Sequence, residues 1–240
     1  MKKIYLATLV LLGCITLGGL SSCMFNCVHG SGHVVSEDRK VGDFSRISIS
    51  GAYKVTLKQD SSLSLKITAD DNLLKYIKTV VSDGRLRIYT RRNLCNNGQM
   101  TITIGIRKLE ELKASGAVEV VSDGAIHTQD LHFKLSGATK ITMGLNAANV
   151  TTTGSGATEL NLKGQATAHN IDLSGVGHVY AFDFVVGSCD IQTSGMGHSE
   201  VNVLNSLSVH SSGASEVRYR GNPSSVTNDK SGASSVEKVN

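Results

Sequence analysis

A row of histidine and glutamate residues is the most chemically distinctive feature of this sequence. Glu159, His178, His198 and Glu216 each stand three residues after a glycine, at intervals of 19, 20 and 18 residues. If these intervals are stacked coils, the two imidazoles lie about 4.8 Å apart, one strand spacing, between carboxylates. Such a set could hold zinc or copper weakly. The alternative is a solvated ladder in which each histidine pairs loosely with an acidic neighbour.

The intervals belong to an internal repeat. Each repeat contains the motif Ser-Gly-small or Ser-Gly-x-Gly. The motif begins at Ser115, Ser136, Ser155, Ser174, Ser194, Ser212 and Ser231. A spacing of 18 to 21 residues between these serines is typical of a solenoid. A similar tripeptide, Ser50-Gly51-Ala52, stands well before them as an outlier.

Hydrophobic residues alternate on both sides of each glycine. The fourth residue after it is apolar in six of seven repeats, namely at Val120, Ile141, Leu160, Val179, Val217 and Val236 but not at Ser199. Alternation with period two predicts short strands with one buried face. Two short strands cannot form a sheet alone, so they must pair with the same strands of neighbouring coils. The sequence therefore predicts an all-β protein, a parallel β-helix of about 19 residues per coil.

The predicted β-helix covers residues 115–240, and a less regular β-rich region, residues 41–114, is expected to pack on its first coil. Within that region we expect a hairpin of residues 46–57 and 63–69, one short helix over 72–78, and strands over 85–89 and 100–106. A cap is needed because an exposed terminal coil offers unpaired backbone to other strands.

Residues 1–22 have the pattern of a secretory signal peptide, with Lys2 and Lys3 before an apolar run. The run ends in Leu20-Ser21-Ser22-Cys23, which resembles the lipobox of bacterial lipoproteins. That resemblance implies cleavage before Cys23 and lipidation of this cysteine, and Met24 in the next position favours the outer membrane. Residues 23–40 are then expected to be a lipidated tether. The alternative is an ordinary secreted protein in which Cys23 has no role.

Three cysteines remain beyond the predicted lipid site, namely Cys27, Cys95 and Cys189. Their spacing matches no zinc pattern, and either one disulfide with a free thiol or three thiols would fit. Cys189 falls on the inward side of the alternation, so we expect a buried small apolar group. Without Lys2 and Lys3 the chain has 22 basic and 20 acidic residues, which gives no footprint for nucleic acid.

Three aromatic residues, Tyr180, Phe182 and Phe184, crowd one stretch of the repeat. If the alternation persists, some of them face outward as a binding patch. A bulge that turns two of them inward fits the sequence equally well.

The chain also resembles a known family. The resemblance depends on the lipoprotein leader, on Val41-Gly42-Asp43-Phe44-Ser45-Arg46-Ile47, on Val81-Ser82-Asp83-Gly84-Arg85-Leu86-Arg87-Ile88, and on the repeated Ser-Gly turns. Together these are similar to the head GIN domain family, labelled "putative auto-transporter adhesin" and frequent in Bacteroidetes. The resemblance covers roughly residues 40–220 and implies a right-handed β-helix. It supplies no catalytic residues.

The expected function is that of an exported, lipid-anchored, non-catalytic β-solenoid for adhesion or for binding and assembly in the cell envelope. Its partners would be the membrane, through Cys23, and a glycan or an envelope protein. The face of the membrane on which it stands is left open. The alternative is a carbohydrate-active enzyme on a β-helix, which needs acidic or basic side chains that converge in a groove. The repeat supplies a single His/Glu row instead.

Overall fold

The computed structural model describes residues 27–95, 98 and 100–240, so the predicted signal peptide and Cys23 lie outside the described residues. The predicted all-β class is confirmed, because strands make up almost all of the regular structure. The elements in chain order are β1 (Cys27–His29), β2 (Val34–Lys40), β3 (Arg46–Gln59), β4 (Ser64–Asp70), α2 (Asp71–Leu74), β5 (Ile77–Ser82), β6 (Arg85–Thr90), β7 (Asn93–Cys95), β8 (Thr101–Ile106), β9 (Glu111–His127), β10 (Asp130–Arg220), β11 (Ser225–Gly232) and β12 (Ser235–Lys238). In the described part of the chain, no helix is long and apolar enough to cross a bilayer.

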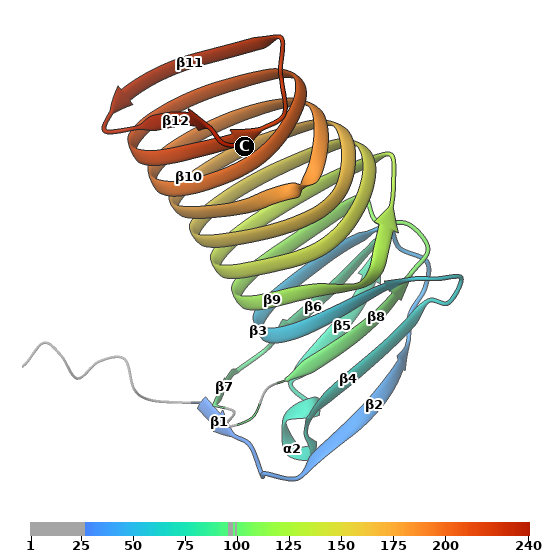
Figure 1. Cartoon of the computed structure of the whole chain (residues 1–240). Coiled ribbons are helices and arrows are strands. Elements are labelled where there is room, and N and C mark those ends of the chain that lie inside the picture. The colour runs from blue at the N-terminus through green and yellow to red at the C-terminus, as the bar shows by residue number, and fades with distance from the viewer. Residues whose placement is uncertain (1–26, 96–97, 99) are drawn as a thin grey trace, which may run out of the picture.

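Strands β3 and β9 to β12 form successive coils stacked along one axis (Figure 1). The pairing of β3 with β9, of β9 with β10, and of β10 with β11 and β12 is parallel. Equivalent turns lie one above another, since Gly116 pairs with Gly51 below it and with Gly137 above it. The outlying tripeptide at residues 50–52 is therefore stacked in register under the repeat, as its first turn.

The interior of the stack is built from the alternating apolar residues. Ile141, Leu160 and Val179, predicted to share one inner row, are all fully buried. The row extends through Ser199, whose side chain is also buried. Each coil thus contributes apolar surface to a core shared with its neighbours, which stabilises the stack.

The N-terminal region differs from the sequence-based expectation. Its strands continue the sheet in the order β3, β8, β4, β2, with β8 parallel to β3 and antiparallel to β4. The predicted hairpin of residues 46–57 and 63–69 is wrong because β8 lies between these two strands. Alternation identifies strands but not their partners. The predicted helix shortens to α2, and the strands predicted near β6 and β8 are present.

Part of the predicted tether, residues 34–40, is the edge strand β2, paired antiparallel with β4. Its charged residues resemble a linker in the sequence, yet Arg39 donates hydrogen bonds to the carbonyl oxygens of Leu74 and Ile77, at 3.1 and 2.7 Å. Charged side chains are common on edge strands because they oppose pairing with another sheet.

The cysteines adopt the first of the two predicted states. Cys27 and Cys95 form a disulfide that joins β1 to β7, a separate two-stranded parallel sheet. Cys189 is free and buried, and burial together with the nearby Asp190 carboxylate raises the pKa of its thiol to about 12. Since the thiolate is the reactive form, Cys189 is inert in the folded protein.

Candidate functional site

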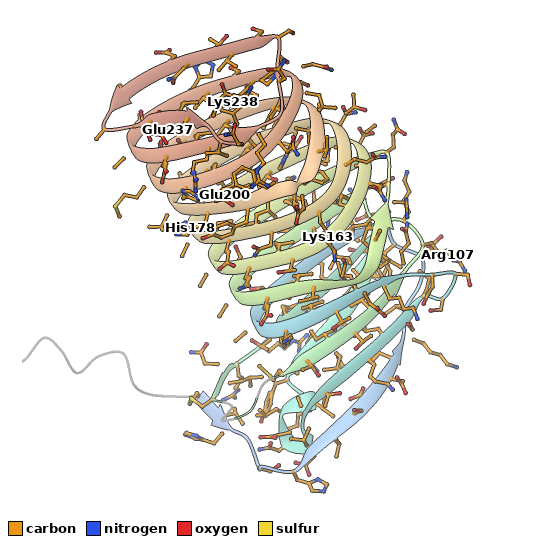
Figure 2. The ribbon with its side chains drawn as sticks, in the orientation of Figure 1. Arg107, Lys163, His178, Glu200, Glu237 and Lys238 are labelled. Atoms are coloured by element: carbon orange, nitrogen blue, oxygen red, sulfur yellow. A yellow bond between two sulfur atoms is a disulfide. The ribbon has the colours of Figure 1, made fainter. Side chains whose placement is uncertain are left out.

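The predicted His/Glu row lies on the outer surface of the stack, as the alternation requires. Glu159, His178 and His198 are partly exposed and Glu216 is exposed, on four successive coils. Figure 2 shows His178 on one flank of the stack, with Glu200 one level above it. The sequence therefore predicted which face carries these residues.

His198 is the centre of one cluster in this row. Its Nδ1 lies 3.0 Å from a carboxylate oxygen of Glu216, and its Nε2 lies 3.2 Å from one of Glu200. Arg218 lies 3.7 Å from the Glu200 carboxylate. Glu200 is absent from the predicted set, although it stands two residues after His198 and so on the same face of the strand.

The other two predicted residues have different partners. Glu159 accepts hydrogen bonds from Asn161 at 2.9 Å and from Lys140 at 2.9 Å, and these contacts lower the pKa of its carboxyl. His178 stacks on Tyr180, with the ring centroids 6.3 Å apart and the planes 9° from parallel. The structure thus brings together His198 and Glu216 from the predicted set, whereas Glu159 faces Lys140.

Among residues 27–95, 98 and 100–240, one group of three potential metal ligands has all its ligand atoms within 4.8 Å of one another, namely Cys27, His29 and Cys95. The two sulfur atoms are joined in the disulfide, so they are not available as thiolates.

Two aromatic side chains lie on the same outer face as the His/Glu row. Tyr180 is 40% exposed and Phe182 is partly exposed, while Phe184 is buried. Two of the three rings thus face outward, as the first alternative predicts, and only Phe184 is turned inward, whereas the second alternative expected two. The guanidinium carbon of Arg220 lies 4.3 Å from the centroid of the Phe182 ring, a cation–π contact.

Two hollows accompany these residues. The first, which we call the aromatic depression, has a volume of about 510 Å³, and its lining includes Asn161, Lys163, Tyr180, Phe182, Glu200 and Arg220. The second, which we call the alanine groove, has a volume of about 650 Å³. Its lining includes five exposed residues that we call its floor, Ala52, Ala117, Ala138, Ala157 and Val176. Glu119, Lys140, Glu159 and His178 form its rim.

One arrangement elsewhere resembles a hydrolytic triad. The Ser208 hydroxyl lies 3.2 Å from Nε2 of His210, and Nδ1 of His210 lies 3.7 Å from the Asp229 carboxylate. The second distance is too long for a hydrogen bond, and the His210 and Asp229 side chains are 45% and 82% exposed. The carboxylate does not hold the imidazole in place, so this geometry does not favour the enzyme alternative.

The stacked coils define an all-β repeat protein with charged and aromatic side chains on its outer face. The chain belongs to the family described as "Putative auto-transporter adhesin, head GIN domain", whose model matches residues 43–223. The predicted family resemblance is thus confirmed. No functionally curated protein matches the chain.

Several solved structures have the same fold. A protein of Bacteroides fragilis NCTC 9343 described as a putative adhesin superimposes with a TM-score of 0.84 at 20% identity, covering 88% of this chain and 100% of its own. A putative adhesin of Parabacteroides merdae ATCC 43184 gives 0.68 at 20% identity, over 90% and 100% of the two chains. A "putative lipid binding protein" of Parabacteroides distasonis ATCC 8503 gives 0.63 at 18% identity, over 90% and 100%. These identities establish a shared fold and nothing about ligands.

Proposed function

We propose that this protein is a right-handed parallel β-helix, anchored to the outer membrane through lipidated Cys23, which binds a polysaccharide on its outer face without catalysis. The single observation that carries the binding function is the exposed Tyr180 ring in a depression that polar side chains also line. Family membership supports an adhesin-like, envelope-associated role.

The position of the proposed anchor determines how the protein would stand on the membrane. Cys23 stands four residues before Cys27, which the disulfide fixes to β7. Figure 1 places β1 and β7 at the N-terminal end of the molecule, and the C terminus at the opposite end of the stack. A lipid at Cys23 would therefore hold the N-terminal end at the membrane and leave the coils projecting away from it. Two or more acyl chains are needed for stable anchoring.

The aromatic depression suits a sugar ring. Aromatic side chains offer a large apolar face of fixed geometry, and the Tyr180 ring lies nearly parallel to the His178 ring beside it. The Asn161 amide, the Glu200 carboxylate and the Arg220 guanidinium surround it with hydrogen-bonding groups. A pyranose has apolar C–H faces and hydroxyl groups at its edge, so it matches both parts.

The Tyr180→Ala variant tests this function. We expect wild-type protein to bind cellohexaose or an oligogalacturonate in a calorimetric titration, and Tyr180→Ala to bind about tenfold more weakly, a loss of about 1.4 kcal/mol. Leu204 is 53% exposed and lies outside the depression, so Leu204→Ala is the matched control and should bind like wild type. Equal affinity of the Tyr180→Ala and wild-type proteins, or no binding of either saccharide at millimolar concentration, would contradict the proposal.

Weak zinc or copper binding by the His/Glu row is a second proposed property, supported by His198 between two carboxylates. The original prediction, Glu159, His178, His198 and Glu216, requires both histidines, whereas in the structure Glu216 contacts Nδ1 of His198 and Glu200 contacts Nε2. An ion on either ring nitrogen of His198 would therefore have one of these two carboxylates beside it. We therefore expect His198→Ala to abolish zinc binding in a titration and His178→Ala to leave it unchanged. If all three proteins bind zinc equally, the row is a solvated ladder.

A further inference from the structure

The alanine groove presents a strip of small apolar side chains to solvent. Each floor residue, from Ala52 to Val176, directly follows one of the stacked glycines on five successive coils. All five are exposed, Val176 to 38%. Four coil spacings give the strip a length of about 19 Å. An apolar group that lies on this strip would remove its methyl groups from water, which is favourable.

The charges along the rim are neutralised in pairs. Lys54 lies 3.7 Å from the Glu119 carboxylate, and Lys140 lies 2.9 Å from that of Glu159. The Glu159 contact raises the pKa of Lys140, so the ammonium form persists at neutral pH. Because the rim carries no excess of either sign, it favours an uncharged occupant. A row of alanine methyl groups about 19 Å long suits an unbranched hydrocarbon chain.

One end of the groove lies where the polypeptide enters the domain. Leu94 and Met100 line this end, and Leu94 immediately precedes Cys95. The Cys27–Cys95 disulfide fixes the start of β1 at the same place. The four residues from Cys27 back to Cys23 can span at most about 14 Å. An acyl chain on Cys23 therefore begins within reach of the groove.

We propose that one acyl chain of lipidated Cys23 lies in the alanine groove, over Ala117, Ala138 and Ala157. This inference rests on the proposed lipid anchor. The chain in the groove is withdrawn from the bilayer, and the remaining chains hold the protein there less firmly. The groove thus makes membrane attachment adjustable, because occupancy of the groove and insertion of this chain compete.

Methyl NMR of the full lipidated protein tests the proposal. The protein carries ¹³C-labelled alanine methyl groups and natural protonated acyl chains, in nanodiscs whose phospholipids have deuterated chains. We expect nuclear Overhauser contacts from acyl methylenes to the methyl groups of Ala117, Ala138 and Ala157. Ala214 occupies the same position of the repeat but lies outside the groove, so its methyl group should show none.

Two tryptophan variants provide the matched comparison. Ala138→Trp places a large ring on the exposed floor and should remove the contacts to Ala117 and Ala157. Ala214→Trp makes the same change outside the groove and should leave them intact. Because both side chains are exposed, neither replacement is expected to disturb the core.

Mass spectrometry of the same sample separates the possible failures. An unmodified Cys23 overturns both the lipid anchor and this inference. Acylated Cys23 without the alanine contacts overturns the inference alone. A third sample holds the Cys23→Ser protein, which has no acyl chain of its own, in nanodiscs of protonated phospholipid. If the alanine contacts appear in this sample and are absent from the wild-type sample, the groove binds membrane phospholipid, and an occupant from Cys23 is contradicted.

Discussion

Replacement of Gly156 by alanine is expected to destabilise the protein by roughly 3 kcal/mol or more. Gly156 has φ of +93°, a conformation that costs any L-residue about 1 kcal/mol. In addition, a Cβ atom there would lie 2.7 Å from the carbonyl oxygen of Gly137 on the coil below. Backbone cannot move aside as a flexible side chain can, so the coils would have to separate locally.

Two other glycines separate these contributions. Gly124 also has positive φ, +87°, but a Cβ there would meet no atom within 4 Å. Gly124→Ala should therefore cost only the conformational strain, about 1 kcal/mol. Gly42 has neither feature, and Gly42→Ala should be neutral or slightly stabilising.

Urea unfolding followed by circular dichroism gives the free energy of unfolding of each variant. The expected order of stability is Gly42→Ala, then Gly124→Ala, then Gly156→Ala as the least stable. If Gly156→Ala costs no more than Gly124→Ala, close contact between stacked turns does not limit stability.

The stack of coils could be predicted from the repeat, because each coil has its turn glycine and its buried residues at the same positions. The buried row at Ile141, Leu160 and Val179 follows from alternation and a fixed interval. Ser50-Gly51-Ala52 carried the same signal, but 65 residues separate Ser50 from Ser115. A period of about nineteen cannot reveal that β3 stacks under β9 when the intervening chain forms β4 to β8 elsewhere.

The sequence predicted which face of the coils carries the candidate site, but not which side chains contact one another there. Alternation placed His198 and Glu216 outward on adjacent coils, and they do meet. Glu159 faces outward as well, yet it has closer partners in Asn161 and Lys140. Which neighbour a long side chain chooses depends on rotamers and on competing donors, and neither is set by the position in the repeat. The alanine groove was missed because each alanine, considered alone, is only a small turn residue.

The buried His169 makes a second large effect predictable, the dependence of stability on pH. His169 is 1% exposed, with Nε2 3.0 Å from the Thr152 hydroxyl and its ring edge-to-face with Phe184. Burial lowers the pKa of His169 from its ordinary value of 6.5 to about 3. The folded protein therefore keeps this imidazole neutral, whereas the unfolded chain binds a proton once the pH falls below about 6.5.

The direction of the effect follows from this difference in proton binding. The contribution of His169 to stability is complete above about pH 6.5 and is lost as the pH falls toward the folded-state value near 3. Within this window one proton corresponds to about 1.4 kcal/mol per pH unit. Between about pH 6.5 and about pH 5, before most carboxylates titrate, we expect a loss of about 2 kcal/mol.

The double variant His169→Leu with Thr152→Val should remove this dependence. Thr152 is changed as well because its hydroxyl, left without a partner in the core, would cost about 1–3 kcal/mol at every pH. Urea unfolding at several values between about pH 7 and about pH 5 gives the slope for each protein. His132 is exposed, so His132→Asn is the matched control and should keep the wild-type slope. A double variant that loses stability as steeply as wild type would mean that other groups take up the proton, and that burial of this imidazole does not control the acid sensitivity of the stack.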